Sequence, residues 1–182
     1  MEKPSPAKRR NAPETKARII AAAARAFSEH GYAQAGIREI ARDAGVAGSL
    51  VVQHFGSKAG LFEAAMSSAM TDQALFEGDR AGFGARMARL LVADADVTLP
   101  TMLILSIGDP DARAITARIT RDHIIEQFAL WLGPPNAHAR AMNIIALCTG
   151  FVVYARSLPI GDVSRHSVDW LARTVQALVD ED

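Results

Sequence analysis

Cysteine is almost absent from the 182-residue sequence, and this scarcity bears on disulfide formation and on the cellular compartment of the protein. The single residue, Cys148, excludes an intramolecular disulfide and suits the reducing cytoplasm. The first residues, MEKPSPAKRRNAPE, carry charge but lack the apolar segment of a secretory signal. The longest apolar run, 144–155, is shorter than the ~20 residues that span a bilayer. We therefore expect a cytoplasmic protein that has no membrane partner.

Residue patterns that build catalytic, cofactor and metal sites are also missing. The sequence has no glycine-rich phosphate loop and no pair of cysteines or histidines at metal-ligand spacing. His123 directly follows Asp122, so the two lie on different faces of a helix, and no nucleophile accompanies them. Cys148 lies in an apolar stretch and is interpreted as a small core residue. We therefore expect no enzyme activity, no metal and no cofactor.

The net charge is zero as well, but the two signs are separated along the chain. Residues 1–58 contain ten basic and five acidic side chains, a charge of +5, whereas residues 59–182 contain ten basic and fifteen acidic ones, a charge of −5. A basic segment is what binding to nucleic acid requires. A chance asymmetry is the alternative, and the charge alone does not separate the two.

The sequence does contain a helical pattern of apolar residues along most of its length. Hydrophobic residues make up 49% of the chain and the mean hydropathy is +0.08, which is enough for a sizeable core. Breaks at Gly and Pro divide the pattern, so we predict an all-α fold of about nine helices that follows a flexible basic tail. The tail is residues 1–12, and the expected helices are 13–30, 37–43, 48–54, 58–76, 83–93, 99–107, 110–132, 136–158 and 163–179.

The stretch 36–58, GIREIARDAGVAGSLVVQHFGSK, contains two short helices separated by a turn. Ile37 and Ile40 begin an apolar stripe at helical spacing, which Gly45 interrupts. Glycine reaches left-handed backbone dihedrals without a Cβ clash, so it can end a helix in a sharp turn. Because a second short helix follows, we interpret the stretch as a helix-turn-helix unit. The second helix of such a unit enters the major groove and presents its N-terminal residues to base edges.

Elimination identifies the residues of the second helix that face DNA. Its apolar residues between 50 and 55 cannot all face solvent, so at least two pack inward. The residues left for the DNA surface are Gly48, Ser49, Val52 and Gln53. Gln53 can bind adenine through two hydrogen bonds, Val52 can contact a thymine methyl group, and Gly48 lets the backbone approach closely.

Polar residues on either side of this helix are predicted to contact phosphates. Ser57 caps the helix that starts at Lys58, whose ammonium forms a phosphate clamp with the free backbone N–H groups there. His54 lies in register with the same surface. Arg38, in the first turn of the preceding helix, faces away from the apolar stripe and is either a DNA contact or a solvated arginine.

The run IREIARDAGVAGSLVVQHFGSK resembles the DNA-binding segment of TetR-family transcriptional repressors. TKARIIAAAARAFSEHGY before it resembles the first helix of the family, so the resemblance covers about the first third of the chain. The remainder is similar only in length and helical character. The resemblance implies a DNA-binding domain at 13–58, with Arg38 in a turn that the family places on DNA, and a ligand-binding and dimerisation domain at 59–182. The implied function is that of a repressor, which a ligand releases from its DNA operator.

Three positions depart from the family pattern. Ala47 stands where a Ser or Thr usually caps the recognition helix, Ser49 stands for the usual Gly, and Val52 stands for a Tyr that reaches a phosphate. Loss of a cap costs about 1 kcal/mol, so these changes affect operator affinity or choice more than the fold. They keep open an alternative function, that of a dimeric small-molecule-binding or scaffold protein whose DNA site has degenerated.

The last two expected helices are predicted to form a homodimer interface, which makes the operator a palindrome. The segment MNIIALCTGFVVY is apolar on both faces, so one face can serve a core or pocket and the other a partner helix. In the last helix an apolar stripe would stay exposed in a monomer. Its residues are Val168, Leu171, Ala172, Val175, Leu178 and Val179.

A ligand pocket is expected between the helices at 99–107, 110–132 and 136–158. Apolar walls with a few polar groups are typical of a site for a small lipophilic molecule. The alternative is that the same residues fill an ordinary core, with Arg118 and Asp122 paired across one helical turn. The expected ligand-binding residues are Met102, Leu105, Ser106, Arg118, Ile119, Asp122, Phe128, Asn143 and Thr149.

Overall fold

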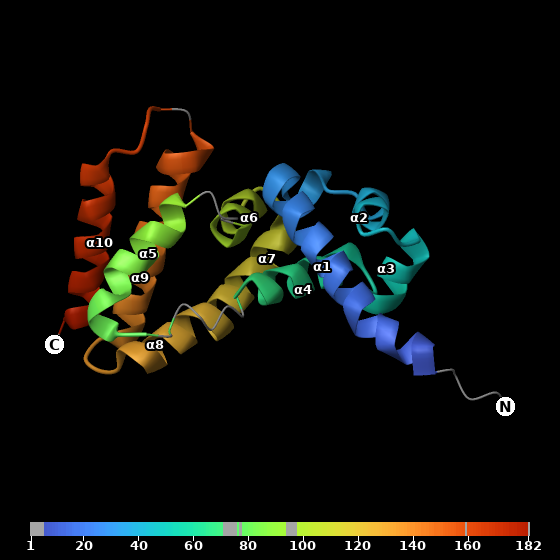
Figure 1. The fold of residues 1–182 in the computed structure, drawn as a ribbon, viewed down its shortest axis with the longest axis horizontal. Helices are drawn as coiled ribbons and strands as arrows, with labels where there is room; N and C mark the ends of the chain where they lie inside the picture. Colours follow the sequence, from blue (N-terminus) through green and yellow to red (C-terminus); the bar gives the residue numbers. More distant parts are fainter. Residues whose placement is uncertain (1–5, 71–75, 77, 94–97, 159, 182) are drawn as a thin grey trace.

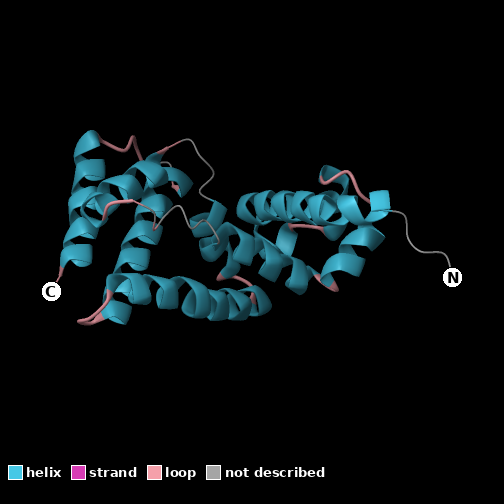
Figure 2. Ribbon diagram, turned by 60° about the horizontal axis from the view of Figure 1, so that its bottom comes forward, coloured by secondary structure: helices cyan, strands magenta, loops and turns pink. Residues whose placement is uncertain are grey.

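The structure is a computed structural model that describes residues 6–70, 76, 78–93, 98–158 and 160–181. Every regular element in those residues is a helix, which confirms the all-α prediction (Figures 1 and 2). The helices form two groups. Helices α1 to α4 lie toward the N-terminal end of the molecule, α5, α9 and α10 lie at the C-terminal end, and α6 and α7 lie between them (Figure 1).

The N-terminal group contains α1 (Pro6–Gln34), α2 (Ile37–Asp43), α3 (Gly48–Phe55) and α4 (Lys58–Met70). Residues 6–12, which were expected in the flexible tail, belong to α1 in the structure, and residues 1–5 lie outside the described part. Ala, Lys and Arg are strong helix formers, and they carry the helix through Pro13. The predicted break at Gly31 is confirmed, since its backbone (φ 74°, ψ 167°) kinks α1.

The rest of the chain follows the predicted order with shifted ends. Pro110–Leu132 is helical throughout, although its middle segment is π-helical, and a second π-helical segment completes the helix that begins at Ala137. Phe76 lies in a turn rather than at the end of α4. The elements are η2 (Arg80–Gly82), α5 (Phe83–Val92), α6 (Thr98–Ser106), α7 (Pro110–Ile119), η3 (Thr120–Ile125), α8 (Glu126–Leu132), α9 (Ala137–Val152), η4 (Val153–Ser157) and α10 (Arg165–Asp180).

Two clusters of buried apolar residues hold these helices together. The N-terminal core joins α1 to α4 through residues such as Phe27, Ile40 and Phe62, and it also includes Met102 of α6 and Ile119 of α7. The second cluster, the C-terminal core, joins α5, η3, α8, α9 and α10. Because α6 and α7 pack into the N-terminal core against α1 and α4, these two helices connect the helix-turn-helix unit to the second half of the chain.

The closest helix contact in the C-terminal core is between α5 and α10. A Cβ atom at Gly84 would overlap the carbonyl oxygen of Ala172, so only glycine lets the two backbones approach this closely. The Gly84 N–H donates a hydrogen bond to the Gln176 side chain at 2.9 Å. This packing corrects the expectation of an exposed stripe on the last helix, because α5 covers it and leaves Leu171 and Val175 fully buried within one chain.

Two arginines fix the C-terminal ends of α8 and α10. Arg140 of α9 is 2% exposed and donates hydrogen bonds to four carbonyl groups at 2.7 to 3.2 Å. Arg80 donates to carbonyl groups at the ends of the same two helices. The last carbonyls of a helix have no partner inside the helix and attract positive charge. Among the described residues no carboxylate pairs with Arg140, and backbone carbonyls supply its hydrogen-bond acceptors.

Aromatic rings fill the C-terminal core beside these arginines. Trp131 lies 4.6 Å from Phe83 and 6.5 Å from Phe128, measured between ring centroids. The guanidinium group of Arg80 lies 5.3 Å from the centroid of the Trp131 ring. This contact adds a cation–π interaction to the hydrogen bonds of Arg80 at the ends of α8 and α10.

The segment Ala137–Ser157 has an unusual balance of apolar composition and exposure. It is long and apolar enough to cross a membrane by these two criteria, yet only 28% of its most apolar window is buried in the chain. The core helix of a soluble protein passes the same test. The segment therefore has apolar surface that the described residues leave largely uncovered.

Candidate nucleic-acid interface

The structure confirms the turn between α2 and α3. Gly45 has a positive φ of 66°, and its N–H donates to the Arg42 carbonyl at 3.0 Å. The next residue, Val46, donates to the carbonyl of Ala41 at 2.9 Å. Ala41 and Val51 are buried in the N-terminal core, so both helices are anchored from behind. The exposed side of α3 is therefore held in a fixed orientation.

The residues that elimination selected on α3 are the accessible ones. Val52 is 47% exposed, and Ser49 and Gln53 are also exposed, whereas Val51 is buried. Gly48 is half-buried, but beyond its chain neighbours and the backbone of its own helix no atom of the described residues lies within 4 Å of the position of a Cβ there. The structure therefore brings the predicted base-reading residues together on the accessible face of one helix.

Ala47 leaves the start of α3 without a side-chain cap. Its backbone is extended (φ −72°, ψ 142°), which is the usual conformation of a cap, but no side chain accepts a hydrogen bond there. The Leu50 N–H donates to the Ala47 carbonyl at 3.0 Å, so the N–H groups of Gly48 and Ser49 are the ones left to donate to an external acceptor. A phosphate oxygen is the acceptor that suits such a helix start.

The flanking residues occupy different environments. Arg38 is exposed in the first turn of α2, and His54 is half-buried at the end of α3. Ser57 caps α4 as predicted, because its Oγ accepts a hydrogen bond from the Gly60 N–H at 3.1 Å. Lys16 of α1 was not predicted, yet its ammonium lies 5.8 Å from the centroid of the Phe55 ring at the end of α3. It adds a cation to this end of the interface.

Lys58 is held in place by α1. Its Nζ donates to the carbonyl of Ala33 at 3.1 Å and lies 4.8 Å from the centroid of the Tyr32 ring. Sequence reasoning missed both partners, although Tyr32 follows the predicted helix break at Gly31. An ammonium has three donors, so one hydrogen bond to a carbonyl leaves donors for a phosphate. The contacts fix where this charge lies relative to the start of α4.

Tyr32 also connects the interface to the second half of the chain. Its ring packs against Phe62 of α4, with centroids 5.2 Å apart. Burial raises the pKa of the Tyr32 phenol, and the negative charges of Asp109 and Asp111 at the start of α7 raise it further. Lys58 thus lies beside the Tyr32 ring, and the carboxylates at the N-terminal end of α7 act electrostatically on the Tyr32 phenol.

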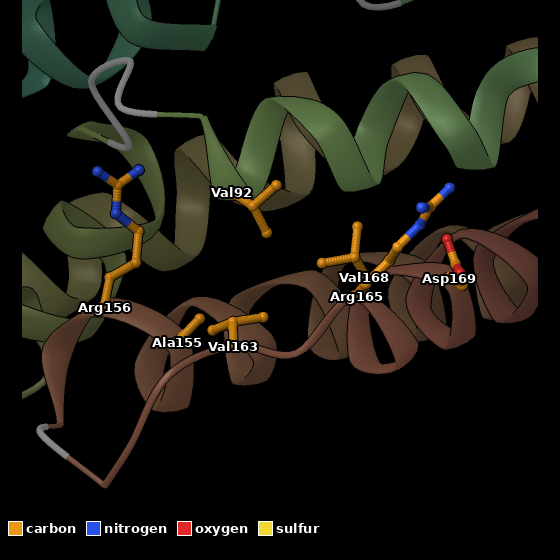
Figure 3. A pocket seen from close by; sticks show the side chains of 7 residues that line it. All are labelled: Val92, Ala155, Arg156, Val163, Arg165, Val168 and Asp169. Atoms are coloured by element: carbon orange, nitrogen blue, oxygen red, sulfur yellow. The ribbon is translucent and has the colours of Figure 1, made fainter.

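The nine predicted ligand residues are distributed over different environments. Met102 and Ile119 are in the N-terminal core, whereas Phe128 is in the C-terminal core. Ser106 is buried and donates to the Leu103 carbonyl, and Thr149 is half-buried. Leu105, Arg118, Asp122 and Asn143 are exposed. None of the nine lines the cavity at the C-terminal end of the molecule, between α5 and α10 (Figure 3).

One expected pairing among these residues is wrong. Arg118 does not pair with Asp122 along its own helix, because its guanidinium binds the Glu63 carboxylate at 2.9 Å. Glu63 is on α4, so the ion pair joins α4 to α7 instead. Sequence spacing identified a partner of the right charge within the helix but could not show that another helix offered a closer one.

The described residues contain buried polar groups but no cluster with metal-site geometry. No group of three or more His, Cys, Asp or Glu that could hold a metal ion occurs in the part of the chain the structure describes. Cys148 is in the C-terminal core, as predicted, and burial raises the pKa of its thiol to about 12. The hydroxyl groups of Thr116 and Thr120 are buried and have no hydrogen-bond partner among the described residues.

Comparisons with known proteins agree with this architecture. The family description "Bacterial regulatory proteins, tetR family" matches residues 19–65, and "Tetracyclin repressor-like, C-terminal domain" matches residues 81–181. No curated protein matches the sequence.

Solved structures share the fold at low sequence identity. A putative TetR-family transcriptional regulator from Rhodococcus sp. is 19% identical, with a TM-score of 0.71 over 92% of this chain and 100% of the other. A second transcriptional regulator, from Rhodococcus sp. Rha1, is 23% identical, with a TM-score of 0.64 over 90% and 93%. A putative TetR-family regulator from Mesorhizobium loti is 20% identical, with a TM-score of 0.63 over 92% and 94%.

The two family matches correspond to the two halves of the chain. The first covers the helix-turn-helix unit and the helices that support it, and the second covers η2 to α10, more than half of the chain. The chain therefore belongs to the TetR family of bacterial DNA-binding transcriptional regulators.

Proposed function

We propose that the protein is a cytoplasmic repressor that binds a palindromic operator as a homodimer and leaves it when a small lipophilic ligand binds. The observation that carries this proposal is the accessible face of α3, where Ser49, Val52 and Gln53 are exposed above a buried Val51. A helix anchored from one side and polar on the other suits insertion into the major groove.

Each residue of the interface has a specific role in the proposal. Gln53 reads an adenine through its amide, and Val52 contacts a thymine methyl group. Ser49, Gly48 and the uncapped N–H groups of α3 approach the DNA backbone. Arg38, Lys58 and Lys16 neutralise phosphates on either side, which makes the affinity dependent on salt. His54 contacts a phosphate on the same surface.

The proposed dimer uses the outer faces of α9 and α10. Met142 is 55% exposed on α9, where Ala139 and Ala146 lie exposed on the same helical face. Trp170 is 45% exposed on α10. Exposed apolar side chains on two neighbouring helices suit an interaction surface, and a second copy of the chain would bury them in a two-fold arrangement.

The proposed release mechanism uses α4 as the link between ligand and DNA. Helix α4 packs against α7 and η3, where Thr116 and Thr120 have buried hydroxyl groups that lack partners among the described residues. These hydroxyls and the buried Met102, Ser106 and Ile119 of α6 and α7 would supply contacts for a ligand. The N-terminal end of α4 carries Lys58, so a shift of α4 changes how the two recognition helices fit DNA.

Selection of bound DNA from a random pool tests the proposal. We expect the wild-type protein to enrich a palindrome with half-sites centred about 34 to 36 Å, or a multiple of this distance, apart. Gln53→Ala should relax the preference at one base pair of each half-site, at a cost of about 1 to 3 kcal/mol. Lys58→Ala should weaken binding to all sequences alike and lower the salt slope by about one unit.

The outcomes of this selection separate the two functions considered for the chain. If the wild-type protein enriches no sequence and shows no salt-dependent binding, the repressor is excluded. The alternative, a dimeric small-molecule-binding or scaffold protein with a degenerate DNA site, would then account for the uncapped α3 and for Val52.

A further inference from the structure

The C-terminal end of the molecule contains a cavity that has no part in the functions considered above. It has a volume of about 590 Å³ and lies between the end of α5, η4 and the start of α10. Ligand sites commonly have volumes of roughly 300 to 1,000 Å³. Its lining residues are Val92, Ala155, Arg156, Val163, Arg165, Val168 and Asp169 (Figure 3).

The lining separates apolar and charged groups. Val92 points down from α5 toward the side chains of Val163 and Val168, so the middle of the cavity is aliphatic (Figure 3). Arg156 lies at one end of this aliphatic part, and Arg165 and Asp169 lie at the other (Figure 3). Two guanidinium groups and one carboxylate give the lining a net charge of +1.

The two arginines have different roles. Arg156 donates to the carbonyl of Ala93 at 2.7 Å and so holds η4 against the C-terminal end of α5. Arg165 is exposed at the first residue of α10, and no ion pair joins it to Asp169 among the described residues. The positive end of the α10 dipole adds to the charge of Arg165. Arg165 is thus the group best placed to bind an anion.

The backbone around the cavity supports a ligand site. Ala155 and Arg156 belong to η4, a π-helical segment, and such segments are frequent at functional sites. Val92, at 36% exposure, presents apolar surface to the opening. An apolar ligand segment would remove this surface from water, which stabilises the complex.

We propose that this cavity binds a small amphiphilic carboxylate. The carboxylate accepts hydrogen bonds from the Arg165 guanidinium, and the alkyl chain lies along Val163, Val168 and Val92 toward Ala155. The single negative charge of the ligand offsets the net charge of the lining. A cationic amphiphile would have to bind Asp169 beside Arg165, which is repulsive, and a neutral one would leave Arg165 without an anion.

Calorimetric titration of octanoate into the full-length protein tests the proposal. We expect saturable binding with one site per chain, weaker binding of octanol and no binding of octyltrimethylammonium. Higher salt should weaken binding of octanoate but not of octanol. This measurement needs no DNA, so a lack of octanoate binding can be distinguished from a lack of DNA recognition.

Variants locate the site. Arg165→Gln should weaken octanoate binding at least about tenfold, because a hydrogen bond to a charged group is lost. Asp169→Asn should tighten binding, since it removes the negative charge near the carboxylate. Arg113→Gln is the matched control: Arg113 is also an exposed arginine in the first turn of a helix, α7, but it lies outside the cavity, so binding should not change.

A third variant blocks the cavity itself. Val163→Trp should abolish binding of octanoate and octanol alike, while circular dichroism shows the helical content of the wild type. If octanoate gives no saturable heat, or if it binds Arg165→Gln and Asp169→Asn as tightly as the wild type, the proposal is wrong. The two charge variants test the proposal even if Val163→Trp does not fold.

Discussion

At the scale of single residues, Arg140 illustrates how one side chain can stabilise several helix ends. Replacement by Met removes four hydrogen bonds, so the carbonyls of Gly133, Pro135 and Leu178 lose this donor and the carbonyl of Val179 keeps only the one from Arg80. Buried acceptors without partners are costly, so we expect the free energy of unfolding to fall by about 3 kcal/mol or more. Urea unfolding monitored by circular dichroism measures this change.

Two further variants make the Arg140 experiment specific. Arg140→Lys keeps the charge but not the planar set of donors, so its loss of stability should be intermediate. Arg121→Met, at an exposed position of η3, should change stability by less than about 0.5 kcal/mol. A loss in Arg140→Met no larger than this control would contradict the role assigned to the buried guanidinium.

Cys148 gives a residue-scale prediction about pH. Burial raises the pKa of its thiol from 9.0 to about 12, so the native state keeps the proton at pH values where the unfolded chain has lost it. The unfolded state binds fewer protons between these values, and the free energy of unfolding should therefore fall as the pH rises from 9 toward 12. Urea unfolding at several pH values should show a shallower fall for Cys148→Ala. Parallel curves for both proteins would contradict the prediction.

At the scale of elements, the proposed dimer assigns different roles to the two faces of the C-terminal helices. Met142→Asp on α9 together with Trp170→Asp on α10 should produce folded monomers that lose operator binding, because charge replaces the exposed apolar contacts. Light scattering and circular dichroism measure the two properties. Leu130→Asp on α8, where Leu130 is 76% exposed, should leave the dimer intact. A dimer that survives the double change would place the interface elsewhere.

The inner face of α10 should respond differently to the same kind of change. Leu171 and Val175 are fully buried against the same chain, so a charge there should unfold the protein rather than separate two folded copies. The apolar period of this helix predicted its existence, but it could not show which partner covers the stripe. That information lies in Gly84, nearly 90 residues earlier in the sequence, where the missing Cβ lets α5 approach.

At the scale of the whole molecule, local patterns predicted more than distant contacts. Gly31 and Gly45 marked real helix breaks, and elimination found the exposed residues of α3, because these features depend on neighbours in sequence. The hydrogen bond from Arg80 to the Val179 carbonyl joins residues 99 positions apart. The ion pair of Arg118 with Glu63 is equally invisible to periodicity. The expected ligand residues were scattered for the same reason.

A whole-molecule prediction concerns the link between ligand and DNA. Thr116→Val replaces a buried hydroxyl that lacks a partner among the described residues, so the free energy of unfolding should rise by about 1 kcal/mol. The same change should weaken release of the operator by an effector identified in a thermal-shift screen. If binding of the effector weakens DNA binding tenfold, bound DNA must weaken effector binding tenfold, a coupling of about 1.4 kcal/mol.

A matched threonine separates this effect from a general one. The Thr174 hydroxyl donates to the Trp170 carbonyl at 2.9 Å, so Thr174→Val should not stabilise the protein or alter release. If Thr116→Val responds to the effector as the wild type does, the hydroxyl is not part of the ligand site, even when its effect on stability is as expected.

The positions of the two tryptophans allow folding and subunit association to be followed by intrinsic fluorescence. The chain has only Trp131 and Trp170, and the DNA-reading helices contain neither. Trp131 lies among aromatic rings in the C-terminal core, so its emission reports unfolding of that core. Trp170 is exposed on the proposed dimer face, so iodide should quench its fluorescence in monomers. As the protein concentration rises and dimers form, iodide should lose access to Trp170 and the quenching should fall. Emission and quenching together would follow folding and subunit association separately, without any added dye.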